Sequence, residues 1–207
     1  NRPQFVLQMR QAFPQTRLVL TLHSLTYLHP SLIRQSQLEQ IFGACDAIVV
    51  NSDFLKREVQ ALSSRHAHKV KRIHLGVDLH KFQPIDSANA IRDHMRAKLQ
   101  LGNKPTVLFI GRLIPQKGLH MLLHAMEQVC QKVPHAILVV VGSAFNGSHI
   151  DTAYVKRQKN HPLCSQGNVR FTSFVPPQQI PSYYTIADVF VTPSIGKEAF
   201  GLVNIEA

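Results

Sequence analysis

The chain has 207 residues, of which 44% are hydrophobic and 17% charged, and its formal net charge is +11. This composition excludes a disordered chain. The longest purely apolar stretch, Ala136 to Val141, is far shorter than the roughly 18 residues that span a bilayer, which excludes a membrane-embedded protein. The three cysteines are far apart and form no Cys-x-x-Cys pair, which excludes a disulfide scaffold and a cysteine-rich zinc site and favours a reducing, cytoplasmic location.

The positive charge is spread unevenly, with +6 over residues 1–84, +2 over 85–104 and +3 over 105–207. A basic chain prefers anionic partners, which are nucleic acid, acidic lipid headgroups or phosphorylated small molecules. Charge alone does not choose among these partners, and a solvated basic surface explains it equally well. Peripheral contact with a membrane is also permitted, although no amphipathic anchor is evident.

No metal site is expected. The twelve histidines are scattered, and the tightest pair, His66 and His68, lies in a polar segment beside Arg65 and Lys69. For this pair we favour a solvent-exposed helix end over a metal site. The sequence also has no Asp-x-Asp motif that would hold a divalent ion beside a phosphate.

In the first half of the chain, short β-branched runs alternate with segments of helical period. The pattern predicts strands over 17–23, 46–51 and 69–75, and helices over 31–42 and 53–62. Ser52 is placed to cap the second of these helices. Residues 85–104 are polar and end in a Gly-Asn-Lys-Pro break, so they predict a partly helical linker between two domains.

The same alternation restarts at Pro105. It predicts strands over 106–110, 136–141, 169–171 and 188–192, and helices over 119–133 and 180–187. The helix over 119–133 gathers its apolar residues on one face, namely Leu119, Leu122, Leu123, Met126, Val129 and Val133. Strands separated by helices form right-handed crossovers and parallel sheets. The fold class is therefore α/β, with two doubly wound domains over 1–84 and 105–207.

The segment Gly111 to Gly118 directly follows a predicted strand and directly precedes a helix. Ligands of open parallel sheets bind at the carboxyl ends of the strands. Gly111 is expected to allow a sharp turn, and the helix beginning near Gly118 offers free N–H groups and a positive dipole end. Arg112 and Lys117 add two cations, so the loop suits a diphosphate. A strand–helix turn with incidental charges is the alternative.

The segment Pro193 to Gly201 follows the last predicted strand and precedes a helix start near Leu202. Glu198 in the loop and Glu206 two turns into the helix are expected to flank one ligand. Carboxylates accept hydrogen bonds from sugar hydroxyls, which favours a polyol, and the N–H groups of Phe200, Gly201 and Leu202 are placed to meet phosphate oxygens. Glycosidase-type acid–base chemistry and a surface carboxylate pair are the alternatives.

Together these segments resemble glycosyltransferase family 4, whose members are retaining enzymes of GT-B fold. The motifs that carry the resemblance are Gly111-Arg-Leu-x-x-x-Lys-Gly118, Val141-Gly142, Phe174-Val-Pro176, Tyr184-x-x-Ala-Asp-Val189, Pro193-Ser194, Glu198-x-Phe-Gly201 and Glu206-Ala207. Upstream, 46–52, 74–78 and Phe82 resemble the end of that family's N-terminal domain. Within the family, these motifs are most similar to those of spore-coat-associated glycosyltransferases. The family's chain extends beyond both ends of this sequence, so we interpret it as an internal fragment that lacks much of the acceptor site.

The resemblance implies a role for individual residues. Arg112 and Lys117 match the pair that holds the donor diphosphate and stabilises the leaving group, and Glu206 matches the ribose-binding Glu. Glu198 matches the Glu that contacts the donor sugar, and Val175 lies where the main chain meets the nucleobase. His23 matches a histidine that reaches the donor sugar from the opposite domain.

The leading hypothesis is therefore a retaining glycosyltransferase that uses a UDP- or GDP-linked sugar as donor, with no tightly bound cofactor and no metal. The acceptor would be a glycan, lipid or small molecule, such as a cell-envelope or spore-coat glycan. A nucleotide-sugar epimerase of GT-B architecture and a non-catalytic structural protein are the alternatives. We expect no nucleic-acid partner, because the basic residues are dispersed and no aromatic-rich basic strand or recognition helix is present.

Overall fold

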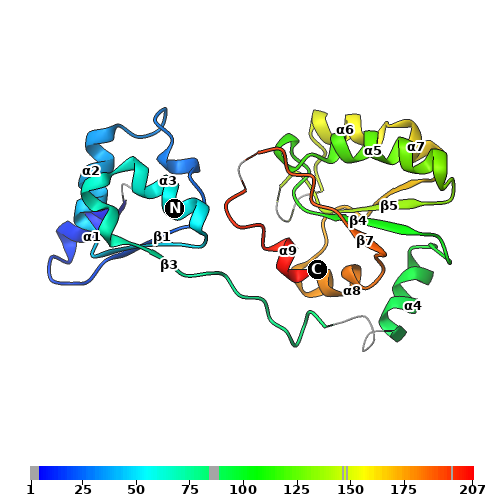
Figure 1. The fold of residues 1–207 in the computed structure, drawn as a ribbon, viewed down its shortest axis with the longest axis horizontal. Helices are drawn as coiled ribbons and strands as arrows, with labels where there is room; N and C mark the ends of the chain where they lie inside the picture. Colours follow the sequence, from blue (N-terminus) through cyan, green and yellow to red (C-terminus); the bar gives the residue numbers. More distant parts are fainter. Residues whose placement is uncertain (1–4, 84–88, 146, 148, 197) are drawn as a thin grey trace. The chain divides into compact units, whose positions relative to one another are not determined.

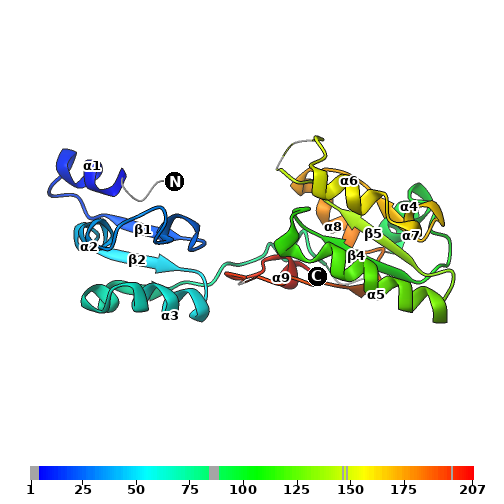
Figure 2. The ribbon, with the colours of Figure 1, turned by 90° about the horizontal axis from the view of Figure 1, so that it is seen from above.

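The computed structural model describes residues 5–83, 89–145, 147, 149–196 and 198–207 (Figure 1). The chain divides into two compact units. Unit 1 comprises Asn1–Gly76 together with Glu198–Gly201, and unit 2 comprises Val77–Lys197 together with Leu202–Ala207. In each unit the described strands form one parallel sheet (Figures 1 and 2).

Unit 1 alternates helices with three short strands. Its elements are α1 (Phe5–Ala12), β1 (Val19–Leu22), η1 (Thr26–Leu28), α2 (Gln35–Ala44), β2 (Ala47–Val50), α3 (Asp53–Leu62), η2 (Ser64–Lys69) and β3 (Val70–Arg72). The strand order is β1-β2-β3, with Val19 opposite Ala47 and Ile48 opposite Val70. Because this order always proceeds in one direction, the crossover helices α2 and α3 cover the same face of the sheet (Figure 1).

The predicted elements of unit 1 are present; the helix over 53–62 has the predicted ends, and the others have shifted ends. Ser52 caps α3 as predicted, because its Oγ accepts a hydrogen bond from the Leu55 amide at 3.1 Å. The helix predicted over 31–42 begins only at Gln35, since the amides of Leu32 and Ile33 turn back to the carbonyl of His29. The strand predicted over 69–75 is shorter, because its partner β2 ends at Val50.

Unit 2 contains a four-stranded sheet between two layers of helices. Its elements are α4 (Asn89–Lys98), β4 (Thr106–Ile110), η4 (Pro115–Lys117), α5 (Leu119–Lys132), β5 (Ile137–Val141), α6 (Ala153–Lys159), α7 (Pro162–Ser165), β6 (Val169–Phe171), η5 (Pro177–Gln179), α8 (Ile180–Tyr184), β7 (Val189–Phe190) and α9 (Val203–Glu206). Helices α5, α6 and α7 lie on one face of the sheet, and α4, α8 and α9 lie on the other (Figure 1).

The strand order of unit 2 is β6-β5-β4-β7. The chain proceeds from β4 outward to β5 and β6, and then returns to the other side of β4 as β7. This reversal is what makes the sheet doubly wound, and it creates a switch point between β4 and β7. Loops that leave the carboxyl ends of these two strands therefore diverge from a common crevice, where ligands of such sheets bind.

The helix predicted over 119–133 is confirmed as α5, but one residue of its predicted buried face is exposed. Leu119, Leu122, Leu123 and Met126 are buried, whereas Val129 is 37% exposed. At about 100° per residue, Val129 lies at the margin of the apolar stripe, and Cys130 lies nearer to its centre. Accordingly, Cys130 packs against the core in its place.

Two other predicted elements of unit 2 are shorter than expected, and three helices were not predicted. The helix over 180–187 ends at Tyr184, and the strand over 188–192 is reduced to Val189–Phe190 because it pairs with β4 alone. Helices α1, α6 and α7 were not predicted from hydrophobic periodicity, because they are short and bury few residues. None of the described helices combines the length and apolar character that a bilayer-spanning segment requires.

The segment predicted as a linker contributes a helix to unit 2. Met95 of α4 and Leu101 are buried in the core beneath α8. Arg96 of α4 donates hydrogen bonds to the carbonyls of Ile186 at 2.8 Å and Lys104 at 2.7 Å. The described part of the segment, from residue 89 onward, is therefore an integral layer of unit 2, while residues 85–88 lie outside the described residues.

Asp188, which directly precedes β7, joins this layer to the sheet. Its Oδ2 accepts a hydrogen bond from the Thr106 amide at 2.7 Å, at the start of β4. Its Oδ1 accepts one from Arg92 of α4 at 3.0 Å. One carboxylate thus ties the entry of two strands to α4.

We expect Asp188→Ala to lower the free energy of unfolding by about 1.5–3 kcal/mol, the range for hydrogen bonds to a charged group. Asp188→Asn keeps an oxygen that can accept from the Thr106 amide, so it should cost clearly less. Denaturant unfolding of both variants beside the unchanged chain measures the difference. Equal losses in the two variants would show that the contact to Thr106 does not matter.

Candidate functional site

Two loops lie side by side at the switch point of unit 2. The first is Gly111–Gly118, after β4, and the second is the segment 191–196, after β7. The amide of Ile195 donates a hydrogen bond to the carbonyl of Gln116 at 3.0 Å. The structure thus brings the first predicted loop together with the opening half of the second.

The first loop is anchored at its beginning by main-chain bonds. The Gly111 amide donates to the carbonyl of Val141 at 3.0 Å, and the Leu113 amide donates to that of Ser143 at 2.9 Å. The side chain of Leu113 is buried in the core of the α5 face. Arg112, between these two anchored residues, is exposed at the carboxyl edge of the sheet. The backbone that carries the Arg112 guanidinium group is therefore held in place on both sides.

Lys117 stands at the end of the same loop, where η4 meets α5. Its side chain is half-buried, and its amide donates to the carbonyl of Ile114 at 3.0 Å. The amide groups that follow are more engaged than predicted. His120 donates to the Tyr154 hydroxyl at 3.4 Å, and Met121 donates to the Gly118 carbonyl at 2.9 Å. The attraction of this helix end for an anion thus depends more on its dipole and on the two cations than on free amides.

Gly118 allows the close approach of these two loops, and Gly142, just after β5, allows the chain there to approach the start of the first loop. Gly118 has a φ of 71°, and a Cβ built there would overlap the carbonyl oxygen of Pro193 in the second loop. Gly142 has a φ of 137°, and a Cβ there would overlap the carbonyl of Gly111. At Gly111 itself a Cβ would meet only the Phe109 ring, at 3.5 Å. The chain bends at Gly111 as expected, but its surroundings leave room for a side chain there.

Glu206 is held by a tyrosine that the sequence argument left without a role. The Tyr184 hydroxyl donates to Glu206 Oε2 at 2.9 Å. Burial, and then the neighbouring Glu206 carboxylate, raise the pKa of Tyr184, so the hydroxyl stays protonated as a donor. The Tyr184 ring is packed against Phe190 and Phe82, with centroid separations of 5.3 and 5.8 Å. Tyr184 stands in one of the family motifs, which was the available signal, since a partly buried tyrosine hydroxyl usually has a hydrogen-bond partner.

The helix predicted near Leu202 is α9, and Leu202 is its N-cap. Glu206 lies in the first turn of α9 and not two turns into it. The Thr192 hydroxyl donates to Asn204 Oδ1 at 2.9 Å, which fixes α9 beside the end of β7. Val175 has a buried side chain, 7% exposed, so a ligand would meet it through its main chain.

The remaining predicted residues belong to unit 1. His23 is exposed just beyond the carboxyl end of β1. The segment 198–201 packs beside the end of β2, where the Ser52 hydroxyl donates to the carbonyl of Ala199. The Phe200 ring lies 6.0 Å from the His74 ring, and Gly201 has a φ of 76°. A joint role of His23, Glu198, Phe200 and Gly201 with the residues of unit 2 stays a prediction.

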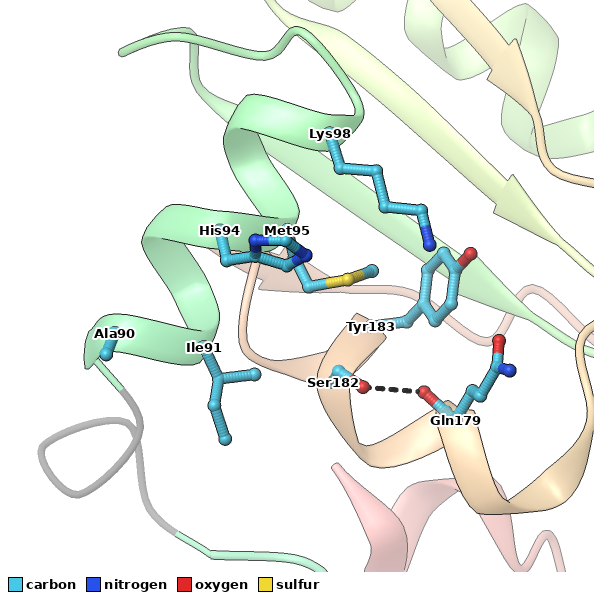
Figure 3. Close-up of a pocket in the computed structure, with 8 residues that line it drawn as sticks. All are labelled: Ala90, Ile91, His94, Met95, Lys98, Gln179, Ser182 and Tyr183. Carbon is cyan, nitrogen blue, oxygen red and sulfur yellow. Dashed lines mark hydrogen bonds between the residues drawn. The ribbon is translucent and has the colours of Figure 1, made fainter.

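A hollow of about 400 Å³ lies between α4 and α8 of unit 2 (Figure 3). Its lining is Ala90, Ile91, His94, Met95, Lys98, Gln179, Ser182 and Tyr183. None of the predicted site residues is among them. The hollow is thus distinct from the paired loops at the switch point.

Comparison with known proteins decides the family. The family model described as glycosyl transferases group 1 matches residues 91–207, which is more than half of the chain. The chain belongs to this family. A second model, described as glycosyltransferase family 4, matches residues 2–81. The resemblance drawn from the motifs is therefore confirmed.

Individual relatives agree with this assignment. The chain is 31% identical over its whole length to spore coat protein SA of Bacillus subtilis (strain 168), of which it covers 55%. It is 29% identical over 84% of its length to a GDP-mannose-dependent phosphatidylinositol monomannoside mannosyltransferase of Mycobacterium tuberculosis (strain CDC 1551 / Oshkosh), of which it covers 44%. The chain thus spans about half the length of the curated relatives that it matches.

A solved structure confirms the predicted GT-B fold class. The crystal structure of HepE from Anabaena in complex with UDP matches with a TM-score of 0.80 at 24% identity, covering all of this chain and 55% of that one. The parallel α/β sheets described above are the features that the two folds share.

We expect Gly118→Ala to destabilise the chain more than Gly167→Ala does. Both glycines have left-handed φ values, 71° and 81°, and an alanine in that conformation costs about 1–2 kcal/mol. Nothing lies within 4 Å of a Cβ at Gly167, whereas one at Gly118 would displace Pro193, which adds about 1–3 kcal/mol. Denaturant unfolding compares the two, and equal losses would contradict the close approach of the loops.

Proposed function

We propose that this chain is part of a retaining glycosyltransferase that moves a sugar from a nucleotide-diphosphate sugar to an acceptor. The observation that carries the proposal is the hydrogen bond from the Ile195 amide to the Gln116 carbonyl at 3.0 Å. It joins the loops after β4 and β7 at the switch point, where doubly wound sheets bind nucleotides. Membership of the glycosyl transferases group 1 family supports the same activity.

In this proposal, Arg112 and Lys117 bind the donor diphosphate. Both cations lie on the loop that opens α5, so their charges add to the positive end of the helix dipole. When the sugar leaves, negative charge grows on the diphosphate, and fixed cations stabilise that charge more than they stabilise the bound substrate. The two side chains thus serve binding and catalysis together. With these cations in place, we propose that transfer needs no metal ion.

Glu206 is proposed to accept hydrogen bonds from the ribose hydroxyls. Its carboxylate is held at 2.9 Å by the Tyr184 hydroxyl, which leaves the second oxygen and further lone pairs for a ligand. Tyr184 is then a positioning residue, fixed by its aromatic neighbours. The main chain of Val175 is proposed to meet the nucleobase, and the amides of Phe200, Gly201 and Leu202 to meet the phosphates.

His23 and Glu198 are proposed to contact the donor sugar, since both match family positions with that role. The donor nucleotide is proposed to be UDP or GDP: HepE was solved with UDP, and the mycobacterial relative is named as GDP-mannose-dependent. The acceptor would be a glycan, a lipid or a small molecule. The net charge of +11 suits peripheral contact with an anionic membrane, and a cytoplasmic location is proposed with it.

Arg112→Ala and Lys117→Ala should each raise the dissociation constant for UDP or GDP at least about tenfold, because each removes a charge-assisted contact that contributes roughly 1.5–3 kcal/mol. Lys132→Ala is the matched control, since it removes an exposed cation from the last turn of the same helix α5. Isothermal titration calorimetry on each folded variant measures the constants.

Turnover in the full-length enzyme should fall by about 100-fold or more in the same two variants, the scale of losing one charged transition-state contact. Lys132→Ala should leave the dissociation constants for UDP and GDP unchanged, and it should leave turnover unchanged. Near-normal nucleotide binding by Arg112→Ala and Lys117→Ala would remove the diphosphate role.

A further inference from the structure

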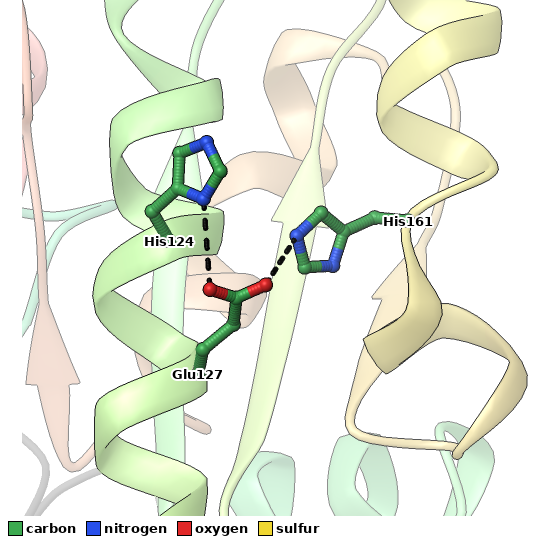
Figure 4. Close-up of side chains that lie close together, drawn as sticks. All are labelled: His124, Glu127 and His161. Carbon is green, nitrogen blue, oxygen red and sulfur yellow. Dashed lines mark ion pairs between the residues drawn. The ribbon is translucent and has the colours of Figure 1, made fainter.

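Three metal-ligating side chains converge on the helical surface of unit 2, apart from the paired loops (Figure 4). His124 and Glu127 lie on α5, and His161 lies just before α7. His124 Nδ1 is 3.6 Å from Glu127 Oε2, and His161 Nε2 is 3.3 Å from Glu127 Oε1. One ligand atom from each residue lies within 4.8 Å of the other two.

The chemistry and spacing of this cluster suit a divalent transition metal. Two imidazoles and one carboxylate are a donor set that binds zinc, with a fourth position left for water. Ligand atoms about 2.0–2.1 Å from a tetrahedral ion lie roughly 3.3–3.4 Å from one another. The two imidazoles contact different oxygens of Glu127, at 3.3 and 3.6 Å, and one ligand atom from each residue lies within 4.8 Å of the other two. The three side chains therefore need only a small closing movement to surround one ion. His124 and Glu127, at i and i+3, share one helix face.

In this cluster one side chain is held in place by the surrounding protein, and the other two are accessible to an ion in solvent. The His161 side chain is only 13% exposed, and its Nδ1 accepts a hydrogen bond from the Leu163 amide at 3.4 Å. The side chains of His124 and Glu127 are 69% and 47% exposed, so an ion can enter from solvent. The two imidazole rings stand at 76° with centroids 6.0 Å apart, so both edges meet the Glu127 carboxylate.

Metal binding would require one proton to move. Because Nδ1 of His161 accepts from Leu163, the ring proton lies on Nε2, where it is donated to Glu127. A metal at Nε2 requires the tautomer protonated at Nδ1, and the bond to Leu163 is then lost. At 3.4 Å that bond is long, so little stability is lost with it.

We propose that His124, Glu127 and His161 bind a divalent transition-metal ion, zinc being the best match, and that this ion joins α5 to α7. His124 is six residues beyond Gly118, about 9 Å along the helix at 1.5 Å per residue. The ion is thus remote from the first loop, and its effect is on stability. In the His66–His68 pair considered from the sequence, His66 has its Nε2 3.5 Å from Glu39 Oε2.

The test is calorimetric titration of Zn²⁺ into the metal-free 207-residue chain, with thermal unfolding in parallel. His124→Ala is the main variant, because its exposed side chain can be removed without disturbing the core. Glu127→Gln removes the carboxylate while keeping its shape. His135→Ala is the matched control, since it removes one exposed histidine from the turn between α5 and β5.

The unchanged chain and His135→Ala should bind one Zn²⁺ saturably, and both should melt at a higher temperature with zinc than without it. His124→Ala and Glu127→Gln should bind at least tenfold more weakly and lose the rise in melting temperature. Equal binding by all four proteins would place zinc on scattered histidines and overturn the proposal, as would the absence of saturable binding to the unchanged chain.

Discussion

The close approach of two main chains at the switch point of unit 2 is the constraint on which the candidate site depends. Gly118, the N-cap of α5, has a left-handed φ, and the space where its side chain would stand is filled by the carbonyl of Pro193. That contact lets the Ile195 amide reach Gln116. Two loops separated by more than seventy residues of sequence thereby become one surface, with Arg112 and Lys117 on it.

The parts of the fold that follow from local pattern could be predicted, and those that depend on tertiary contacts could not. The wholly buried strand β5 and the Ser52 cap of α3 each depend on a few adjacent residues, so the local sequence predicts them. Helix α1 is not, because Arg10 secures it through the carbonyl of Ala44 and the carboxylate of Asp46, far along the chain. In the same way, α4 resembles a linker by composition, and tertiary contacts such as those to Asp188 and Ile186 make it a helical layer against the sheet.

The same distinction between local sequence and tertiary contacts applies to the candidate site. Its charged residues were found because charge and loop position are visible in sequence, and the family motifs assign them roles. The residues that orient them were present in the motifs but had no role assigned, because Gly142 acts through the Gly111 carbonyl in the loop after β4, and Tyr184 acts through a carboxylate 22 residues away. The three zinc-type ligands were missed for the same reason, since His161 reaches α5 only through the fold.

Hydrogen–deuterium exchange of the chain with and without UDP tests the central claim most directly. If the paired loops form the nucleotide site, UDP should slow exchange in peptides covering 111–122 and 191–196, and it should leave the α4–α8 surface around 90–98 and 179–183 unchanged. Protection confined to the α4–α8 surface, or absent from both loops under conditions in which calorimetry shows UDP bound, would contradict it.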